Sequence, residues 1–558
     1  MREQDTGSKQ WNRAESVAHA SAFEASRASE ATSQREFARK EGVPRTTLQY
    51  WLSRQRNLDA SPALVGFFES PDGLAFLHRL VIVLHFVLGF LGPCGLRTIV
   101  RALELAGLEP FVANSFGSHQ KLAASMEGEI IEFAEMERKR LAARMPPKRI
   151  TVCEDETFHP AICLVAIEPV SNFLLLERYV DRRDAATWDA AIRDALVGLP
   201  VQVIQSTGDE AKALLAHARD GLGAHHSPDL FHVQQEVTRA TSVGVAAQVR
   251  RAETEAATAK AATAAERMEA EAWAQSDQGR GRPPAFAQRI EKAENAEQQV
   301  AQTLLAARNR QERLKKSIQG IGQDYHPVEL STGVPQCAAK LEEKLEQHFA
   351  EIVAVAVEAN LPERCHKGIQ KAHRLVPALV ATLAFYDREV NMRIAALGLS
   401  SVAAKVVRDT LVPAAYLERA ARKAQPADAR PALRQRAEEM RHVALLHPAN
   451  TPATTEQCAR VERVVAECAD LFQRASSCVE GRNGQLSLHH HGLHNLSPTR
   501  LQALTAVHNY FLTRSDGTTA AQRFFENKPA NLFSWLLDHI DMPARPARKR
   551  PPLASSLN

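Results

Sequence analysis

Cysteine is sparse in this 558-residue chain and does not cluster. The eight cysteines include no C-x-x-C pair, which argues against a zinc finger and against a disulfide framework. We therefore expect reduced, mostly buried thiols and a cytoplasmic location.

Long apolar runs are also lacking. The N-terminal stretch MREQDTGSKQWNRAES is polar and has no apolar segment of the kind that a signal peptide needs. The most apolar stretch, residues 80–91, reads LVIVLHFVLGFL and contains His85. A membrane-spanning helix needs about 20 apolar residues, so we expect a buried core helix here and no membrane partner.

A strong excess of one charge is absent as well. The net charge is +4, with 45% hydrophobic and 24% charged residues, which is ordinary for a soluble globular protein. A surface that binds nucleic acid must therefore come from a local basic patch rather than from the overall charge. The length predicts about three or four domains.

Residues 33–56, SQREFARKEGVPRTTLQYWLSRQR, have the pattern of a helix-turn-helix unit after a polar, disordered N-terminus over residues 1–30. Ser33 can cap a first helix, Gly42 permits the turn, and Pro44 suits the first turn of a second helix. Six lysines or arginines against two glutamates fit an element that faces phosphates. The alternative is a helical hairpin with no role in DNA binding. The side chains expected to contact DNA are Arg45, Thr46, Gln49, Tyr50 and Arg54.

The hydrophobic period changes at Lys148. Short apolar runs broken by proline and Ser-Asn predict three consecutive strands, and alternating helices and strands follow. This order predicts a mixed five-stranded sheet with helices on both faces, and hence an α/β core. The predicted strands are residues 148–158, 161–169, 172–180, 201–209 and 228–233, and the predicted helices are 184–199, 210–222 and a third from 234.

The remaining sequence predicts helices. Residues 236–320, rich in Ala, Glu, Lys, Arg and Gln, indicate two long helices broken at 276–284, as in an antiparallel coiled-coil hairpin. The expected domains are a helix-turn-helix unit (31–60), a helical region that could form a second DNA-binding unit (61–147), an α/β core in two parts (148–240 and 471–540), an all-α insertion (241–470) and a basic disordered tail (541–558).

Acidic residues stand at the ends of two predicted strands. Asp155 ends the first strand between Glu154 and Glu156, and Asp209 ends the fourth before Glu210. Side chains at the carboxyl ends of neighbouring strands can converge across a crevice. Two carboxylates there repel each other unless a cation neutralises them, and Mg²⁺ favours such oxygen ligands. Strand alternation alone does not decide which of the three acids around Asp155 faces the crevice.

The order of strands and acids resembles the ribonuclease-H-like core of bacterial DDE transposases, in some groups of which a helical insertion separates the fifth strand from the last acid. The resemblance covers roughly residues 148–240 and 470–530. The segments that carry it are CEDETF (153–158), STGDEAKAL (206–214), PDLFHVQQEV (228–237) and SSCVEGRNGQL (476–486).

The resemblance implies Asp155, Asp209 and Glu480 as catalytic residues that hold two Mg²⁺ ions, which Mn²⁺ can replace. It also implies supporting roles for His232 and Asn483. The activity would be cleavage of transposon ends and strand transfer into target DNA, by a nucleoid-associated homodimer or larger assembly on double-stranded DNA. The alternatives are a domesticated, non-catalytic DNA-binding protein and a nuclease of the same fold.

Two histidine-rich stretches are alternative metal sites. HHSPDLFH, residues 225–232, has a spacing seen in zinc sites, but a strand starting at Pro228 would point Asp229 and His232 to opposite faces. We therefore expect Asp229 to be structural. The triplet at 489–491 would point its side chains about 100° apart on one helix, so those histidines cannot bind one ion together. His490 and His494, four residues apart, could bind one, but Gly492 and Asn495 indicate that the helix ends there.

Overall fold

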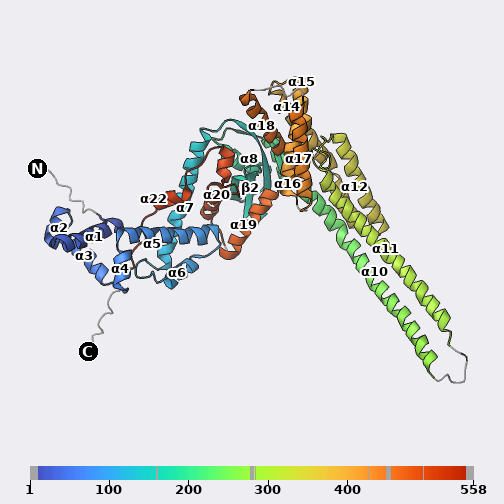
Figure 1. The fold of residues 1–558 in the computed structure, drawn as a ribbon, viewed down its shortest axis with the longest axis horizontal. Helices are drawn as coiled ribbons and strands as arrows, with labels where there is room; N and C mark the ends of the chain where they lie inside the picture. Colours follow the sequence, from blue (N-terminus) through green and yellow to red (C-terminus); the bar gives the residue numbers. More distant parts are fainter. Residues whose placement is uncertain are drawn as a thin grey trace.

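A computed structural model describes residues 10–158, 161–276, 282, 284–424, 427–447, 454–493 and 495–547. It has a mixed α/β fold in which one five-stranded sheet lies between an N-terminal helical unit and a large group of helices (Figure 1). The predicted combination of an α/β core, an N-terminal helical region and an extensive helical insertion is confirmed at this level.

The N-terminal unit consists of α1 (Arg13–Glu30), α2 (Gln34–Lys40) and α3 (Arg45–Arg56). A capping box starts α1: the Asn12 side chain accepts from the backbone of Glu15, whose carboxylate accepts from the backbone of Asn12. Phe23 of this helix is buried in a cluster with the apolar faces of α2 and α3. Disorder over residues 1–30 was therefore a wrong prediction for α1, and residues 1–9 lie outside the described residues.

The apolar stretch is part of a longer helical run. α4 (Pro62–Phe68) precedes α5 (Pro71–Leu84), which continues into a π-helical turn over His85–Leu91. Among the described residues, Pro71–Leu91 is the one helical segment long and apolar enough to cross a membrane, yet 50% of its apolar window is buried. Because its buried side chains join the main core beside α7, it is a core helix, as predicted, and does not indicate a membrane protein. The next helices are α6 (Leu96–Leu105) and α7 (Phe116–Ala142).

The sheet has the strand order β3-β2-β1-β4-β5. β1 pairs with β2 and β2 with β3 in antiparallel fashion, whereas β1 and β4, and β4 and β5, are parallel. The mixed sheet is therefore confirmed, and four of its strands lie where predicted. The strands are β1 (Lys148–Phe158), β2 (Ile162–Glu168), β3 (Phe173–Val180), β4 (Val201–Gly208) and β5 (His225–Pro228).

The fifth strand was predicted too late in the chain. β5 ends at Pro228, and Asp229 is the N-cap of a helix that begins at Leu230. The Asp229 carboxylate accepts from the backbone of Phe231 at 2.7 Å, so residues 230–233 are helical rather than extended. An apolar run this short fits either structure, and the capping aspartate decides for a helix.

Helices cover both faces of the sheet, as predicted. α8 (Ala185–Leu196) and α9 (Lys212–Ala216), with a π-helical turn at His217–Gly221, lie on one face. The other face is covered by α7 together with helices from the C-terminal part of the chain. Those helices are α19 (Ser477–Leu493), α20 (Pro498–Tyr510), α21 (Ala520–Phe525) and α22 (Leu532–His539).

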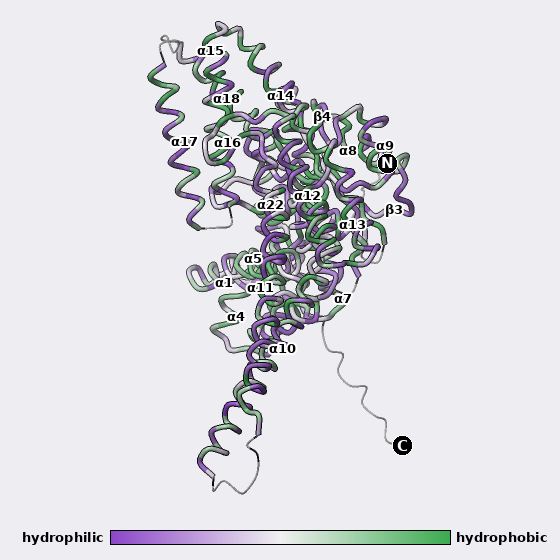
Figure 2. Tube along the Cα trace, turned by 90° about the vertical axis from the view of Figure 1, so that its right-hand side faces the viewer, coloured by the Kyte–Doolittle hydropathy of each residue, from purple (hydrophilic) through white to green (hydrophobic). Residues whose placement is uncertain are grey.

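Between β5 and α19 the described residues form helices with a hydrophobic core of their own. α10 and α11 make the predicted antiparallel hairpin, which projects far from the body in both views (Figures 1 and 2). The helices are α10 (Leu230–Gln275), α11 (Phe286–Asp324), α12 (Ala338–Glu358), α13 (Glu363–His373), α14 (Val376–Ala395), α15 (Ser401–Val406), a π-helical turn (Val407–Leu411), α16 (Val412–Lys423), α17 (Ala429–Leu446) and α18 (Thr455–Leu471).

The segment after α22 returns to the N-terminal unit. Arg545 binds the buried Glu69 at 2.6 Å, and Glu69 also binds Arg13 of α1 at 3.3 Å. Arg13 also donates to the backbone carbonyl of Pro543 at 2.6 Å. The predicted disordered tail is therefore corrected for residues 541–547, which are tied down, while residues 548–558 lie outside the described residues.

Candidate functional site

Asp155 lies on the face of the sheet that α19 covers. In β1 it stands opposite Val165 of β2, and Val165 belongs to the same core cluster as Val479 of α19. Directly opposed residues of an antiparallel pair share a face. Cys153, two residues earlier, points the same way, and its thiol donates to the backbone carbonyl of Ala475, just before α19, at 3.9 Å. The Asp155 side chain therefore faces the start of α19.

The two acids that flank Asp155 point to the opposite face, toward α8. Glu154 accepts a hydrogen bond from the Ser206 hydroxyl at 2.5 Å and pairs with His217 at 3.2 Å. Glu156 pairs with Arg183 at 3.1 Å and accepts from the Trp188 indole at 3.2 Å. Of the three neighbouring acids, Asp155 is thus the one on the α19 face, a choice that the sequence left open.

Asp209 follows the last residue of β4. The parallel register pairs Cys153 of β1 with Thr207 of β4. Asp155 and Asp209 each follow two residues later, so they lie side by side where the two strands end. One Asp209 oxygen accepts from the backbone of Ala211 at 3.0 Å, which fixes the turn into α9.

Glu480 reaches this edge of the sheet because the start of α19 is anchored on both sides. The buried Asp229 accepts from the backbone and the hydroxyl of Ser476, at 2.9 and 2.5 Å, so it has the structural role expected of it. Two residues after Glu480, Arg482 makes a bidentate, buried ion pair with Glu177 of β3, at 2.7 and 2.6 Å. Glu480 itself is exposed in the first turn of the helix.

Asp155 feels the negative charges of the two other acids. The pKa of the Asp155 carboxyl is raised to about 6, mainly by burial and in addition by the negative charges of Glu480 and Asp209, whereas a backbone hydrogen bond from Glu156 opposes the rise, as does His232. Asp155, Asp209, Glu480 and His232 are therefore neighbours, although Glu480 lies about 270 residues after Asp209.

His232 and Asn483 stand at the margin of this group. His232 lies in the first turn of α10, beside the exposed ring of Phe231. Asn483 lies one turn after Glu480, and its buried side-chain oxygen has no hydrogen-bond partner among the described residues. An unpaired buried amide oxygen next to acids is an acceptor that is open to a ligand or an ordered water.

Oxygen donors of this kind suit a hard divalent cation. In the part of the chain that the structure describes, however, no three His, Cys, Asp or Glu side chains stand close enough to hold a metal ion as a group. This includes both histidine-rich stretches: His489 is buried, with its pKa lowered to about 4 by burial and nearby arginines, while His491 is exposed. The three carboxylates would have to draw together around an ion.

The residues predicted to contact DNA lie on the outer face of α3. Arg45, Thr46, Gln49 and Tyr50 are exposed, as a recognition surface requires. Arg54 is partly covered, because it donates to the Tyr50 hydroxyl at 3.1 Å and to the backbone carbonyl of Pro546 at 2.6 Å. Contact with DNA at these positions stays a prediction.

A family model now gives an independent comparison. The family of unknown function DUF6399 matches residues 407–552. The match covers α19 with Glu480 but neither aspartate, and it spans about a quarter of the chain. No curated protein and no solved structure matches this chain.

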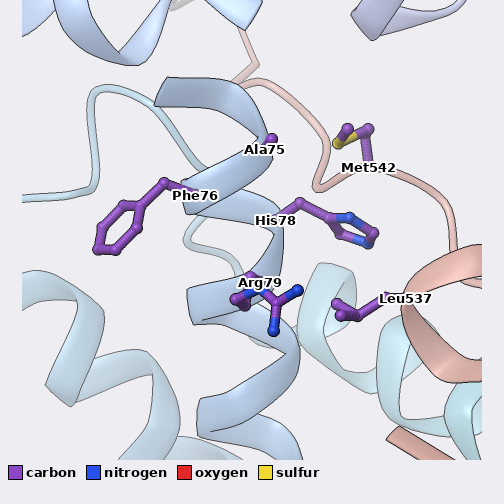
Figure 3. Close-up of a pocket in the computed structure, with 6 residues that line it drawn as sticks. All are labelled: Ala75, Phe76, His78, Arg79, Leu537 and Met542. Atoms are coloured by element: carbon purple, nitrogen blue, oxygen red, sulfur yellow. The ribbon is translucent and has the colours of Figure 1, made fainter. Parts of the chain in front are cut away.

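A small cavity of about 300 Å³ lies elsewhere, between α5 and the C-terminal segment (Figure 3). His78 points into it from α5, toward Leu537 and Met542, whereas Phe76 points away (Figure 3). None of the three acids lines this cavity, so it is separate from the acidic group.

Sequence reasoning missed the network behind the acids. His217 is buried between Glu154 and Asp189. Burial alone would lower the pKa of His217, but hydrogen bonds to the two carboxylates raise it above the ordinary value. The alternation of β1 placed Glu154 and Asp155 on opposite faces of the sheet, but nothing in the sequence indicated which residues each side chain would contact.

Proposed function

We propose that this protein is a DDE-type DNA transposase whose sheet is a ribonuclease-H-like core interrupted by a helical insertion. The observation that carries the proposal is the electrostatic coupling of Asp155 to both Asp209 and Glu480, since α19 brings the third acid back to the edge where β1 and β4 end. The strand order, with β1 antiparallel to β2 and parallel to β4, also supports it.

Asp155, Asp209 and Glu480 would hold two Mg²⁺ ions, or Mn²⁺ in their place. Bound ions of this kind stabilise the attacking and leaving oxygens of an in-line phosphoryl displacement. The chain itself supplies carboxylates that repel one another until a cation arrives. The amide nitrogen of Asn483 can donate to Glu480, and its open oxygen can accept from a water. His232, in the first turn of α10, can contact a phosphate.

The exposed face of α3 would recognise the transposon ends. Its basic and polar side chains suit phosphates and base edges in a major groove. Because transposition joins two ends, we expect a homodimer or a larger assembly on double-stranded DNA. A nucleoid-associated, cytoplasmic location follows from this substrate.

The test is metal-dependent cleavage of a duplex that carries the inverted repeat flanking the coding sequence. With Mg²⁺ or Mn²⁺ the wild type should cut this DNA and join the freed 3′ end to a target. Asp155→Asn, Asp209→Asn and Glu480→Gln should each lower cleavage at least about 100-fold while DNA binding persists. Glu156→Gln is the matched control, because Glu156 lies on the same strand but on the opposite face.

Other outcomes would overturn the proposal in distinct ways. Cleavage without joined products indicates a nuclease of this fold. Specific binding without any cleavage indicates a domesticated DNA-binding protein. Cleavage that survives all three acid substitutions would remove the acids from the mechanism.

A further inference from the structure

A cavity of about 800 Å³ lies where the helical insertion joins the sheet domain. Its walls come from the start of α10, the end of α11, the C-terminal half of α16 and residues 472–477, which lead into α19. Phe231, which precedes His232 in the chain, lines the cavity, and so does Ser477, three residues before Glu480. Two wall residues are thus close in the chain to members of the acidic group, although none of the three acids lines the cavity, and its volume is that of a small-molecule site.

The cavity has positive charge that its own acids do not neutralise. Two of its cations are paired within the wall: Lys344 with Asp324 at 3.0 Å, and Arg419 with both oxygens of Asp470. Arg474 and Lys423 have no carboxylate partner among the described residues. The largely buried Arg474 donates only to the backbone carbonyl of Gly322, and its Nε has no partner there. A buried guanidinium in this state favours an anion.

The walls also offer aromatic surface. Tyr416 and Phe472 are buried in the wall, whereas Phe231 is 50% exposed beside His232. Exposed aromatic rings next to unpaired cations are the elements with which proteins hold single-stranded nucleic acid, because bases stack on the ring and phosphates pair with the cations. A polar small molecule without a ring would leave Phe231 unused.

We propose that this cavity binds one nucleotide unit of a single DNA strand, with its phosphate at Arg474 and Lys423 and its base against Phe231. The inference rests on the proposed function, since it places the strand beside the acids that would cut it. The cavity thus serves as a positioning site for the strand that enters or leaves the acidic group.

The test measures binding of a 5′-fluorescein-labelled ten-nucleotide single strand to the full-length protein by fluorescence anisotropy, in EDTA so that no cleavage occurs. Phe231→Leu should weaken binding at least about fivefold, because stacking on an aromatic ring contributes about 1–3 kcal/mol per base. Its matched control is Phe76→Leu, a ring of 51% exposure outside the cavity, which should change nothing.

The second pair of variants tests the phosphate contact. Lys423→Gln should weaken binding and lower the slope of log K against log salt by about 0.7, the value for one single-strand phosphate. Arg422→Gln, the adjacent exposed cation in the same last turn of α16, should leave both quantities unchanged. Lys423 is exposed, so its loss does not threaten the fold as loss of the buried Arg474 would.

Several outcomes would overturn the proposal. One is equal affinity in wild type, Phe231→Leu and Lys423→Gln; another is equal loss in the controls. Inorganic phosphate that binds as tightly as the strand would assign the cavity to a free anion instead. If the protein does not cleave DNA but its affinity for the strand depends on Phe231 and Lys423, only the proposed function is contradicted. If the protein cleaves DNA and both substitutions leave its affinity for the strand unchanged, only this inference is contradicted.

Discussion

The surroundings of Asp155 disfavour its ionised carboxylate in the ligand-free protein, and a bound cation would remove that penalty. Its carboxyl is partly buried, faces two other acids, and has a pKa raised to about 6. A carboxyl whose pKa is higher in the folded than in the unfolded chain stabilises the fold while it is protonated, and that stabilisation is lost as the pH rises through the folded pKa. The acid therefore makes the metal-free protein less stable at neutral and alkaline pH.

We predict that Asp155→Asn raises the free energy of unfolding of the metal-free protein at pH 8 by up to about 3 kcal/mol. The gain should shrink from about pH 6 downward and vanish below about pH 3, where the wild-type carboxyl is protonated in both the folded and the unfolded chain. Urea titrations in EDTA between pH 3 and 8 measure it. Added Mg²⁺ should then stabilise the wild type more than the variant.

The control for this prediction is Glu156→Gln on the same strand. This change removes an ion pair with Arg183 and an acceptor for Trp188, so no stabilisation should follow. A stability difference between wild type and Asp155→Asn that does not vary with pH would contradict the assigned environment of Asp155.

At the scale of the element, α19 is the helix on which the site depends. Val479 and Leu486 of this helix are buried in the core. Its buried ion pair is Arg482 with Glu177, whose side chains are 5% and 0% exposed. Removal of one member of a buried ion pair leaves the other charge unpaired in a low dielectric. Thr505 also donates to Glu177, but it carries no charge to replace the arginine.

We predict that Arg482→Met lowers the free energy of unfolding by about 3–5 kcal/mol and abolishes activity that depends on Glu480, because the helix loses its anchor two residues away. Chemical denaturation and the cleavage assay measure these effects. The matched control is Arg178→Met on the same strand as Glu177. Arg178 and its partner Asp194 are 51% and 61% exposed, so the cost should stay below about 1 kcal/mol. Similar costs for the two changes would mean that α19 is not anchored through Glu177.

Much of the sheet was predictable element by element, because strands with apolar runs bounded by turn residues are a local pattern. β1 matches its prediction to the residue, and Asp184 caps α8 as its sequence indicates. α1 was not predicted, because its alanine- and serine-rich composition favoured disorder, although Asn12 and Glu15 form a capping box that the sequence contains. The convergence of the acids was not predictable from local pattern, because it depends on contacts such as Ser476 with Asp229 that join distant segments.

At the scale of the whole molecule, the C-terminal segment connects the sheet domain with the N-terminal helices. Glu69 is 5% exposed and stands between Arg13 and Arg545. The backbone carbonyl of Ala544 also accepts from Ala113 at 2.8 Å. The first and last described parts of the chain therefore stabilise each other.

We predict that truncation after residue 540 increases amide hydrogen exchange in α1 and α3 and leaves β1 and β4 unchanged, because the partners lost belong to α1, α3 and the segments at Glu69 and Ala113 rather than to the sheet. Exchange followed by mass spectrometry measures this. Truncation after residue 547 keeps every one of these contacts and should behave as the wild type. Faster exchange throughout the sheet in the shorter protein would mean that the segment supports the whole fold instead.

The separation of Glu480 from the two aspartates also has a consequence for synthesis. Asp155 and Asp209 leave the ribosome early, and Glu480 follows about 270 residues after Asp209. At about 5–20 residues per second, the nascent chain carries two acids without the third for roughly 15–50 s. During translation the strands can already pair, but an incomplete polypeptide lacks the helix that completes the acidic group. Under the proposed function, a chain that is still being synthesised near its own gene would therefore be unable to cut the DNA that encodes it.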